Sequence, residues 1–329
     1  MSETVLILGA AGRLGRELCL AFSGAGWRTL AHSRKPLPAE LLALPGLQAV
    51  SADALDVNTL LGEVRAAGGA GVVINALNPP YTQWHRLALP LASAAQDLAL
   101  GLDALLVLPG NVYNFGSTLP PLLRRNSAEH GDHDKARIRI AIEAQMAAAD
   151  KQGLDSVVLR AGDFFGGAGR GSWFDLAIAS RLAKGEMVYP GSLDRIHAWA
   201  YLPDLAQAFV RVASQRERLY GHSRLHFAGH AVEGQVLLDC LNALCARPLR
   251  AASLPWGLIR LGAPLVPSWR AIVEMRYLWE RPHQLDDSDL RQLIGPPPRT
   301  ALATALRQSL QQLGLGELLR DGPAMLQAA

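Results

Sequence analysis

The stretch VLILGAAGRLGREL, residues 5–18, decides the fold. An apolar run of four residues leads into Gly9, Gly12 and Gly15, spaced G-x-x-G-x-x-G, and a helical pattern begins inside the motif. Such a turn needs glycines because a β-carbon would keep the backbone away from a bound pyrophosphate, whose charge the N–H groups of the following helix attract. The alternative is a purely structural strand–helix turn, but a strand, this loop and a helix in direct succession predict dinucleotide binding.

The same alternation of short apolar runs and longer helical patterns continues through the first 165 residues. Strands are expected at residues 5–8, 28–32, 47–51, 71–75, 104–108 and 156–160, and helices near 14–23, 57–67, 83–100 and 135–151. Strands that are apolar almost throughout and alternate with helices are typical of a parallel sheet covered on both faces. The pattern therefore predicts a Rossmann-type, doubly wound α/β fold.

The alternation of strands and helices ends after Gly166. GGAGRGS is expected to form a glycine-rich loop, and a helical run follows at residues 173–184. The last hundred residues are helical and interrupted by prolines, as in LPWGLIRLGAPLVPSW. We predict that residues 1–165 form the dinucleotide-binding domain and that 196–228 return to it. Residues 166–195 and 229–329 are then a smaller, mostly helical subdomain that covers the substrate.

Composition excludes several classes of function. Half of the 329 residues are hydrophobic, 19% are charged, and the net charge is +3 with no Lys/Arg block longer than a pair, which argues against nucleic-acid binding. No uncharged apolar run is long enough for a membrane span, and Glu3 stands where a signal peptide would carry positive charge. Three cysteines without a CxxC pair fit reduced thiols. We expect a cytoplasmic protein.

The end of the second strand, AHSRKPLP, indicates which nicotinamide cofactor is bound. A site for an unphosphorylated ribose usually has an acidic residue there, but this chain has Ser33, Arg34 and Lys35 and no acid before Glu40. Cations and a hydroxyl suit the 2′-phosphate of NADP, because charge-assisted hydrogen bonds to phosphate are strong. Arg13 of the glycine loop is expected to join them. The alternative is that Arg34 and Lys35 are ordinary solvated charges, so NADP is favoured over NAD.

Five segments together carry a family resemblance: GAAGRLG, SADALD, LPGNVYNFG, LRAGDFFGG and HAWAYLPDLAQAF. The chain resembles the NAD(P)-dependent epimerase/dehydratase group, in the extended or atypical branch of the short-chain dehydrogenase/reductase superfamily. The resemblance extends over roughly residues 4 to 300 and is most specific in the glycine motif and the strand ends.

The resemblance implies the residues that hold the cofactor. Asp53 would bind the adenine amino group with the backbone of Ala54, although Asp53 also fits a helix cap; Asp56 lies closer to that helix. The glycine loop would contribute Gly9, Ala11, Gly12, Arg13, Leu14 and Gly15. The end of the fourth strand would contribute Asn75, Ala76 and Leu77. The substrate side would be lined by Asp163, Phe164 and Phe165.

The catalytic set departs from the family pattern of Ser/Thr with YxxxK. Asn111 stands in the place of the serine, and four residues before the candidate lysine, Lys135, stands Gly131. Asn111 can still donate a hydrogen bond to a carbonyl oxygen. If the strand continues in extended form, Tyr113 lies on the same face and can act as the acid with Lys135 as its cation. The alternatives are that Tyr113 packs a pocket wall and that Lys135 faces solvent.

The segment HGDHD raises the question of a metal. His130 and His133 are spaced as a ligand pair, but no third ligand is indicated by spacing, and we expect no metal. Asp132 and Asp134 are explained as capping and dipole residues of the helix that follows.

Two functions of different classes follow. The first is an NADP(H)-dependent oxidoreductase of the epimerase/dehydratase type that acts on a small carbonyl or hydroxyl compound without the usual serine and YxxxK motif. The alternative is a non-catalytic NADP(H) sensor that regulates a partner, as in NmrA-like relatives. The helix of residues 136–149 is apolar on more than one side. Because the equivalent helix of the superfamily that the chain resembles often builds a dimer, we predict a homodimer; the alternative is a second packing partner within the chain.

Overall fold

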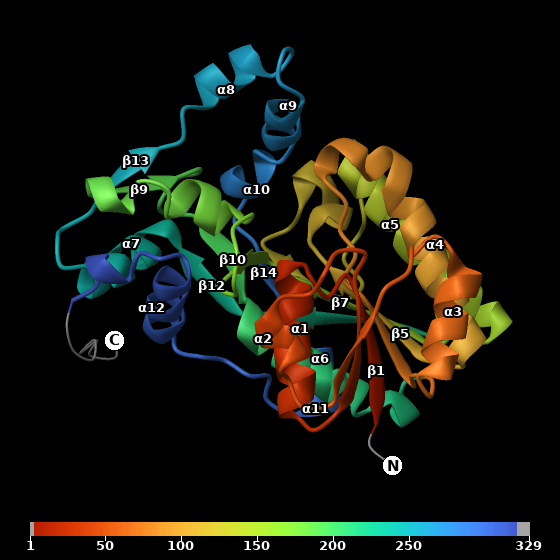
Figure 1. The fold of residues 1–329 in the computed structure, drawn as a ribbon. Coiled ribbons are helices and arrows are strands. Elements are labelled where there is room, and N and C mark those ends of the chain that lie inside the picture. Colours follow the sequence, from red (N-terminus) through yellow and green to blue (C-terminus); the bar gives the residue numbers. More distant parts are fainter. Residues whose placement is uncertain (1–2, 321–329) are drawn as a thin grey trace.

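A seven-stranded, all-parallel sheet forms the centre of the molecule, for which a computed structural model describes residues 3–320 (Figure 1). Its strand order is β11-β7-β5-β4-β1-β2-β3. Six strands lie where the sequence predicts them, with ends that differ by one or two residues, and β11 adds a seventh. The strands are β1 (Thr4–Leu8), β2 (Arg28–His32), β3 (Leu47–Val50), β4 (Val72–Asn75), β5 (Leu105–Gly110), β7 (Ser156–Ala161) and β11 (His222–Phe227).

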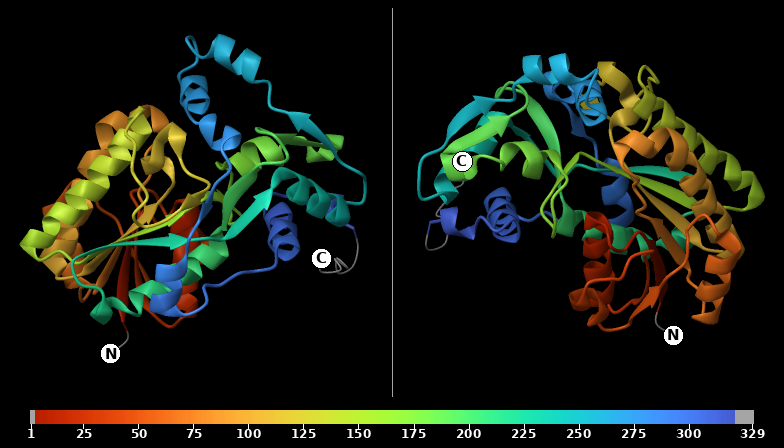
Figure 2. Two further views of the ribbon diagram at one scale, coloured as in Figure 1. Left: turned by 180° about the vertical axis from the view of Figure 1, so that it is seen from behind. Right: turned by 45° about the horizontal axis from the view of Figure 1, so that its top comes forward.

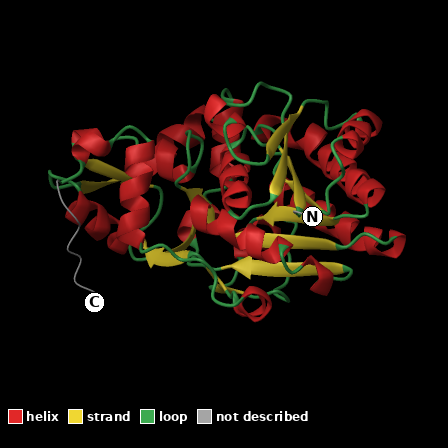
Figure 3. Cartoon of the chain, turned by 60° about the horizontal axis from the view of Figure 1, so that its bottom comes forward, coloured by secondary structure: helices red, strands yellow, loops and turns green. Residues whose placement is uncertain are grey.

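Helices cover both faces of this sheet, which confirms the doubly wound fold (Figures 1 and 3). Alternate residues of β1 point to opposite faces, so Val5 and Ile7 enter one core while Leu6 and Leu8 enter the other. On one face lie α1 (Arg13–Gly24), α2 (Ala39–Leu42), α6 (Leu202–Ala213) and α11 (Ser288–Ile294). On the other lie α3 (Val57–Ala66), α4 (Trp84–Leu102) and α5 (Asp134–Ala149). The homodimer expected on α5 stays a prediction.

The C-terminal part contains helices and three small sheets, which Figure 3 shows beside the main sheet. The helices are α7 (Gly234–Leu244) and α12 (Leu302–Gln312). The first small sheet has the order β12 (His230–Glu233), β10 (Ile196–Tyr201), β8 (Asp163–Phe165). The second pairs β13 (Arg250–Ser253) with β9 (Glu186–Tyr189), and the third pairs β14 (Gln284–Leu285) with β6 (Leu122–Leu123).

The helix expected at residues 173–184 is instead two short turns, a π-helical turn at Phe174–Ile178 and a 3₁₀ turn at Leu182–Lys184. Between them, the Ser180 hydroxyl donates a 2.6 Å hydrogen bond to the carbonyl oxygen of Ala177. Such a side-chain bond competes with the regular backbone ladder, which accounts for the interruption.

Residues 254–281, here called the C-terminal arm, arch from the C-terminal part towards the side of the sheet that carries α5 (Figure 2). The arm contains α8 (Trp256–Gly262), α9 (Pro267–Glu274) and α10 (Tyr277–Glu280). Trp279 anchors its end, being 2% exposed and stacked on His197 with ring centroids 4.2 Å apart. The arm therefore brings residues far along the chain to the site.

A buried ion network fixes α5 against the sheet. Arg160 on β7 and Glu143 on α5 both have fully buried side chains and form an ion pair. Glu143 also accepts hydrogen bonds from Arg224 at 3.2 Å and from the Asn114 amide at 3.0 Å. Because a buried charge is tolerated only when it is paired, this network fixes the second half of α5, where Glu143 lies, on the sheet. Within residues 3–320, no helix has both the length and the apolar character that a membrane crossing would need.

Candidate functional site

The glycine loop follows β1 as a tight turn that only glycine fits. Gly9 has a φ of +82°, and the N–H groups of Gly9 and Ala10 both donate to the carbonyl oxygen of His32, at 3.1 and 2.9 Å. The Gly12 N–H donates to the Gly9 carbonyl at 2.9 Å. A β-carbon at Gly15 would lie 2.2 Å from that same oxygen, so helix α1 can approach the loop only with glycine there.

The first turn of α1 is open to an anion. Its N-cap is Gly12, which contributes no capping side chain, and the first turn contains no acidic residue. The N–H groups at a helix start have no partner within the helix and attract negative charge. Leu14 packs into the core below the loop, so only its backbone is available there. The backbone from Gly9 through Ala11 to Gly15 fits a pyrophosphate.

Arg13 points away from the corner where the sequence led us to expect it. One guanidinium nitrogen lies 2.6 Å from the Asp175 carboxylate, and another donates at 2.6 Å to the carbonyl oxygen of Gly166. Burial lowers the pKa of Arg13, and the Asp175 charge opposes that effect. The structure thus places Arg13 on the loop after β8 instead of beside Arg34 and Lys35.

Ser33, Arg34 and Lys35 lie together directly after β2. The buried Ser33 hydroxyl accepts a 3.2 Å hydrogen bond from the Lys35 N–H, which tightens the corner. Both cationic side chains are exposed, and neither has an ion-pair partner within the part of the chain that is described. The corner therefore offers two free cations and a hydroxyl.

The adenine-side residues form a second corner. The Asp53 carboxylate accepts a 3.0 Å hydrogen bond from the Leu55 N–H in a local turn, whereas Asp56 caps α3 through the Thr59 N–H at 3.2 Å. The helix-cap alternative is therefore taken by Asp56, and Asp53 stays exposed beside the buried Ala54.

Residues 75–77 close the glycine loop from the side of β4. Ala76 donates its N–H to the Leu8 carbonyl at 3.0 Å, and a β-carbon on Gly9 would lie 3.0 Å from the Ala76 carbonyl oxygen. Asn75 is buried, and its side-chain oxygen accepts from the Leu77 N–H at 3.3 Å. The structure thus brings these three residues together with the glycine loop.

The chain beyond β5 curls, whereas the sequence suggested an extended run. The strand ends at Gly110, and a 3₁₀ turn covers Tyr113–Thr118. The Asn111 side-chain oxygen accepts a 3.0 Å hydrogen bond from the Tyr113 N–H, a local bond that favours the turn over the strand. The Nδ2 group of Asn111 stays available to donate.

Tyr113 is buried, with 5% of its surface exposed. Its hydroxyl lies 3.0 Å from the hydroxyl of Tyr81, a residue that is 44% exposed. Burial raises the pKa of Tyr113 well above its ordinary value, and the hydroxyl of Tyr81 adds to this effect. The phenol of Tyr113 is thus directed at Tyr81.

Lys135 is also buried, but it is not paired with Tyr113. Its Nζ forms an ion pair with the Glu274 carboxylate and donates at 3.2 Å to the Ala271 carbonyl oxygen. The same nitrogen lies 5.2 Å from the ring centroid of Tyr81. The expected cation is therefore present at the site, bound to an acidic residue of the C-terminal arm.

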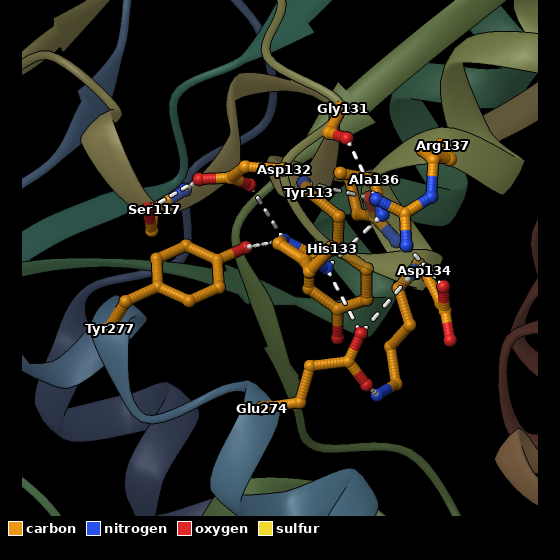
Figure 4. Close-up of polar contacts among 12 residues, drawn as sticks. Tyr113, Ser117, Gly131, Asp132, His133, Asp134, Ala136, Arg137, Glu274 and Tyr277 are labelled. Atoms are coloured by element: carbon orange, nitrogen blue, oxygen red, sulfur yellow. Dashed lines mark hydrogen bonds and ion pairs between the residues drawn. The ribbon is translucent and has the colours of Figure 1, made fainter.

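Two residues of this site were missed by the sequence analysis, Glu274 and Tyr277, and both meet His133, which the sequence analysis weighed as a metal ligand (Figure 4). The His133 ring lies between the other two, with Nδ1 at 3.2 Å from Glu274 Oε1 and Nε2 at 3.1 Å from the Tyr277 hydroxyl. His133 lies two positions before Lys135, a weak signal that could have been used. Nothing in the sequence around Glu274 and Tyr277 indicates that they meet α5.

The expectation that Asp132 and Asp134 cap α5 is correct only in part. Asp134 lies in the first turn, but His133 holds the N-cap position, where its Nδ1 lies 3.2 Å from the backbone nitrogen of Ala136. Asp132 accepts from the Ser117 N–H at 2.9 Å instead, because the turn after β5 folds back over it. Across residues 3–320, no group of three ligating side chains gathers around a metal position.

A second polar pair lies on the C-terminal side. Asp163 on β8 accepts a 2.8 Å hydrogen bond from Nε2 of His197, which is itself stacked on Trp279. The charge of Asp163 contributes to raising the pKa of Tyr113 and of Tyr277, after the larger effect of burial.

A family model described as the NAD dependent epimerase/dehydratase family matches residues 5–223 of the chain. No curated protein sequence matches it.

Several solved structures share the fold. One is a UDP-glucose-4-epimerase from Stenotrophomonas maltophila with bound NAD and formylated UDP-arabinopyranose (TM-score 0.76, 15% identity, 95% of this chain and 98% of that chain). Another is UDP-glucose 4-epimerase from Brucella ovis with NAD (TM-score 0.73, 15% identity, 96% and 99%). A third is WbmH from Bordetella bronchiseptica with NAD⁺ (TM-score 0.72, 17% identity, 95% and 99%). At these identities, the likeness concerns the fold.

Proposed function

The chain belongs to the NAD-dependent epimerase/dehydratase family, and from that premise we propose that it is an NADP(H)-dependent oxidoreductase. Its substrate is a small compound with a carbonyl or hydroxyl group. The observation that carries the proposal is the glycine loop, where Gly9, Gly12 and Gly15 leave room for a pyrophosphate beneath an uncapped helix start.

The choice of NADP rests on the corner after β2. Arg34 and Lys35 are exposed and unpaired among the described residues, and the hydroxyl of Ser33 lies between them and the strand. A 2′-phosphate would satisfy both cations, while an unphosphorylated ribose would leave them without a partner. Asp53, Ala54, Asn75, Ala76 and Leu77 would hold the adenine and ribose parts.

The reaction itself would take place at the carboxyl ends of β4 and β5. The bound nicotinamide would supply the hydride chemistry. The Nδ2 group of Asn111 would donate a hydrogen bond to the substrate oxygen and orient it. Burial raises the pKa of Tyr113, and its hydroxyl is directed at Tyr81. Tyr113 would therefore position Tyr81 beside the substrate. Lys135 would hold the Glu274 carboxylate of the C-terminal arm in place at the site.

One observation favours the second function, a non-catalytic NADP(H) sensor. The ion pair between Lys135 and Glu274 neutralises the cation that the family uses in catalysis. A protein that only binds the cofactor has no need for a free lysine there.

Two experiments test the proposal. Calorimetry measures binding of the four nicotinamide dinucleotides, and an assay of NADPH oxidation with a panel of aldehydes, quinones and nucleotide sugars measures turnover. We expect NADP⁺ and NADPH to bind at least about tenfold more tightly than NAD⁺ and NADH, a difference of about 1.4 kcal/mol, and at least one carbonyl compound to be reduced. Binding without turnover of any compound would favour the sensor. If none of the four dinucleotides binds, both functions are wrong.

A further inference from the structure

We infer that Tyr277 of the C-terminal arm is the proton donor and acceptor of this site, and that His133 and Glu274 position it. The inference rests on the proposed oxidoreductase function and assigns the group that replaces the missing tyrosine of YxxxK. Neither the family match nor the sequence pattern points to these residues.

Three side chains form a continuous hydrogen-bonded line from phenol to imidazole to carboxylate (Figure 4). The Tyr277 hydroxyl is 3.1 Å from Nε2 of His133, and Nδ1 of the same ring is 3.2 Å from Glu274 Oε1. A hydroxyl, a histidine and a carboxylate in this order form a unit that moves a proton to and from the hydroxyl, as serine hydrolases illustrate on unrelated folds. Here the hydroxyl is a phenol, whose proton suits a carbonyl oxygen.

The position of the proton on His133 follows from its two neighbours at Nδ1. That nitrogen lies 3.2 Å from the Ala136 N–H, which would need it unprotonated, and 3.2 Å from the Glu274 carboxylate, which needs it protonated. A hydrogen bond to a carboxylate is the stronger of the two because it is charge-assisted. Nδ1 therefore carries a proton, and Nε2 faces the Tyr277 oxygen, ready to accept or return one.

Lys135 keeps Glu274 ionised for this task. Burial alone would raise the pKa of Glu274, but hydrogen bonds from His133 and Lys135 and the charge of Lys135 outweigh it and lower the pKa to about 2. A carboxylate that stays charged across the working pH range holds the imidazole in one orientation. This explains why a buried lysine is present although no tyrosine stands four residues before it.

The phenol of Tyr277 belongs to the same site as Asn111 and Tyr113. The Tyr113 hydroxyl lies 3.0 Å from that of Tyr81, and the Tyr81 ring centroid lies 5.2 Å from Nζ of Lys135, which pairs with Glu274 of the arm. The charge of Asp163 also raises the pKa of both Tyr113 and Tyr277. Tyr113 follows β5, and the crevice beyond the carboxyl ends of such strands is where ligands bind in open α/β sheets. The titratable groups facing Tyr277 are Tyr81, Asp132, His133, Asp163 and Glu274.

The proton balance closes in both directions. In reduction, the substrate oxygen gains a proton from the Tyr277 hydroxyl, and the phenol oxygen regains one from Nε2 of a doubly protonated His133. The ring is left neutral with its Nδ1 proton still directed at Glu274, and solvent restores the second proton. In oxidation, neutral His133 receives at Nε2 the proton that Tyr277 takes from the substrate hydroxyl.

A purely structural role is the competing explanation, since the same contacts fasten the arm to α5. Four variants separate the two: Tyr277→Phe, His133→Gln, Glu274→Gln and the matched control Tyr201→Phe. Tyr201 is a buried tyrosine whose hydroxyl donates to Gln308 at 2.5 Å, outside this site. Each protein is assayed for NADPH affinity by calorimetry, for kcat across pH with the best carbonyl compound of the panel, and for the His133 ring by ¹⁵N NMR. The spectrum of His133→Gln identifies the His133 signals.

We expect Tyr277→Phe to lower kcat by about 100-fold or more, the size of a general-acid contribution, with unchanged NADPH affinity. His133→Gln should lower kcat as well, and Tyr201→Phe should behave as the native protein. The NMR signal should show a proton on Nδ1 that is lost in Glu274→Gln.

Three results would overturn the inference. The first is native kcat and pH profile in Tyr277→Phe while the native protein is active. The second is an Nδ1 that is unprotonated, which shows that the ring only caps α5. The third is NADPH binding with no turnover in the native protein, which removes the proposed function as well and is thereby distinguished from the first two.

Discussion

The glycine loop and the cluster of Lys135, His133, Glu274 and Tyr277 are built in opposite ways. The loop is seven consecutive residues whose proposed function lies in backbone N–H groups and in the absence of a β-carbon at Gly9, Gly12 and Gly15. The cluster consists of side chains from two segments that are 139 to 144 positions apart. One region is continuous in the chain, and the other exists only because the C-terminal arm packs against α5.

The difference shows which kinds of site tolerate change. A backbone-made loop depends on local geometry, so any residue with a β-carbon at the wrong position disrupts it. A side-chain cluster depends on the packing of whole elements, and the network beneath α5 controls it from a distance. Five experiments test this contrast, beginning with the largest expected effect.

Arg160→Met should destabilise the protein by about 3–5 kcal/mol, because it leaves the buried Glu143 without its main partner. Urea denaturation measures the loss. Arg250→Met is the control, since Arg250 also pairs with a glutamate but its side chain is 79% exposed, and a loss below about 1 kcal/mol is expected. Equal losses in the two variants would show that the network does not fix α5.

Gly15→Ala should weaken NADP⁺ binding by about 100-fold, or about 2.7 kcal/mol, because the new methyl group meets the Gly9 carbonyl oxygen at 2.2 Å. Calorimetry measures the affinity, and circular dichroism checks that the fold persists. Gly62→Ala in α3 is the control because a β-carbon there has no neighbour within 4 Å. Unchanged affinity in Gly15→Ala would contradict the backbone-made site.

A double-mutant cycle of Lys135→Met and Glu274→Gln should give a coupling free energy of about 1–2 kcal/mol in urea denaturation. The pair is largely buried, so solvent screens it less than a surface pair. The exposed pair of Arg276 and Glu280 on α10 serves as the reference, with about 0.5 kcal/mol expected. If both cycles give the same coupling, the arm is held by its aromatic contacts alone.

Arg34→Ala should lower the affinity for NADP⁺ by about tenfold and leave that for NAD⁺ unchanged, since only the 2′-phosphate meets this side chain. Calorimetry measures the affinity for both cofactors, and the affinity for NAD⁺, which lacks the 2′-phosphate, is the control. A parallel loss for NAD⁺ would mean that Arg34 contacts something other than the phosphate.

The smallest effect is a contrast in pH response between the two regions. Glu274, with its pKa lowered to about 2, adds stability above its ordinary pKa of about 4.3 that is lost as the pH falls towards 2. Glu17 on α1 has a raised pKa, chiefly through burial, so its stabilising effect is present below the ordinary value and is lost as the pH rises through the raised one.

Thermal unfolding from pH 7 to 2.5 measures the contrast. The melting temperature of Glu274→Gln should approach that of the native protein as the pH falls. The melting temperature of Glu17→Gln should be most similar to that of the native protein at low pH and should exceed it near pH 7. The same trend in both variants would contradict the opposite pKa shifts.

Much of the sheet could be predicted because its strands are apolar on both faces and its helices have a strong period. Strand β11 was not predicted because its sequence, HSRLHF, mixes polar and apolar residues, which is typical of a strand at the edge of a sheet. The prediction that Tyr113 lies on the same face as Asn111 depended on an extended chain. Instead, the Tyr113 N–H donates a local hydrogen bond to the Asn111 side chain, and the segment forms a turn. Arg13 was assigned to the wrong partner because a flexible side chain can reach several, and only the tertiary structure brings Asp175 within 2.6 Å.

The sequence by itself determined the cofactor loop and the fold around it. Both follow from residue types at short, fixed spacings, where the backbone geometry is nearly independent of the rest of the molecule. Only the tertiary structure decided which acid meets Lys135 and which phenol meets His133. Those contacts join residues about 140 positions apart, and they depend on where the arm packs, which no local pattern encodes.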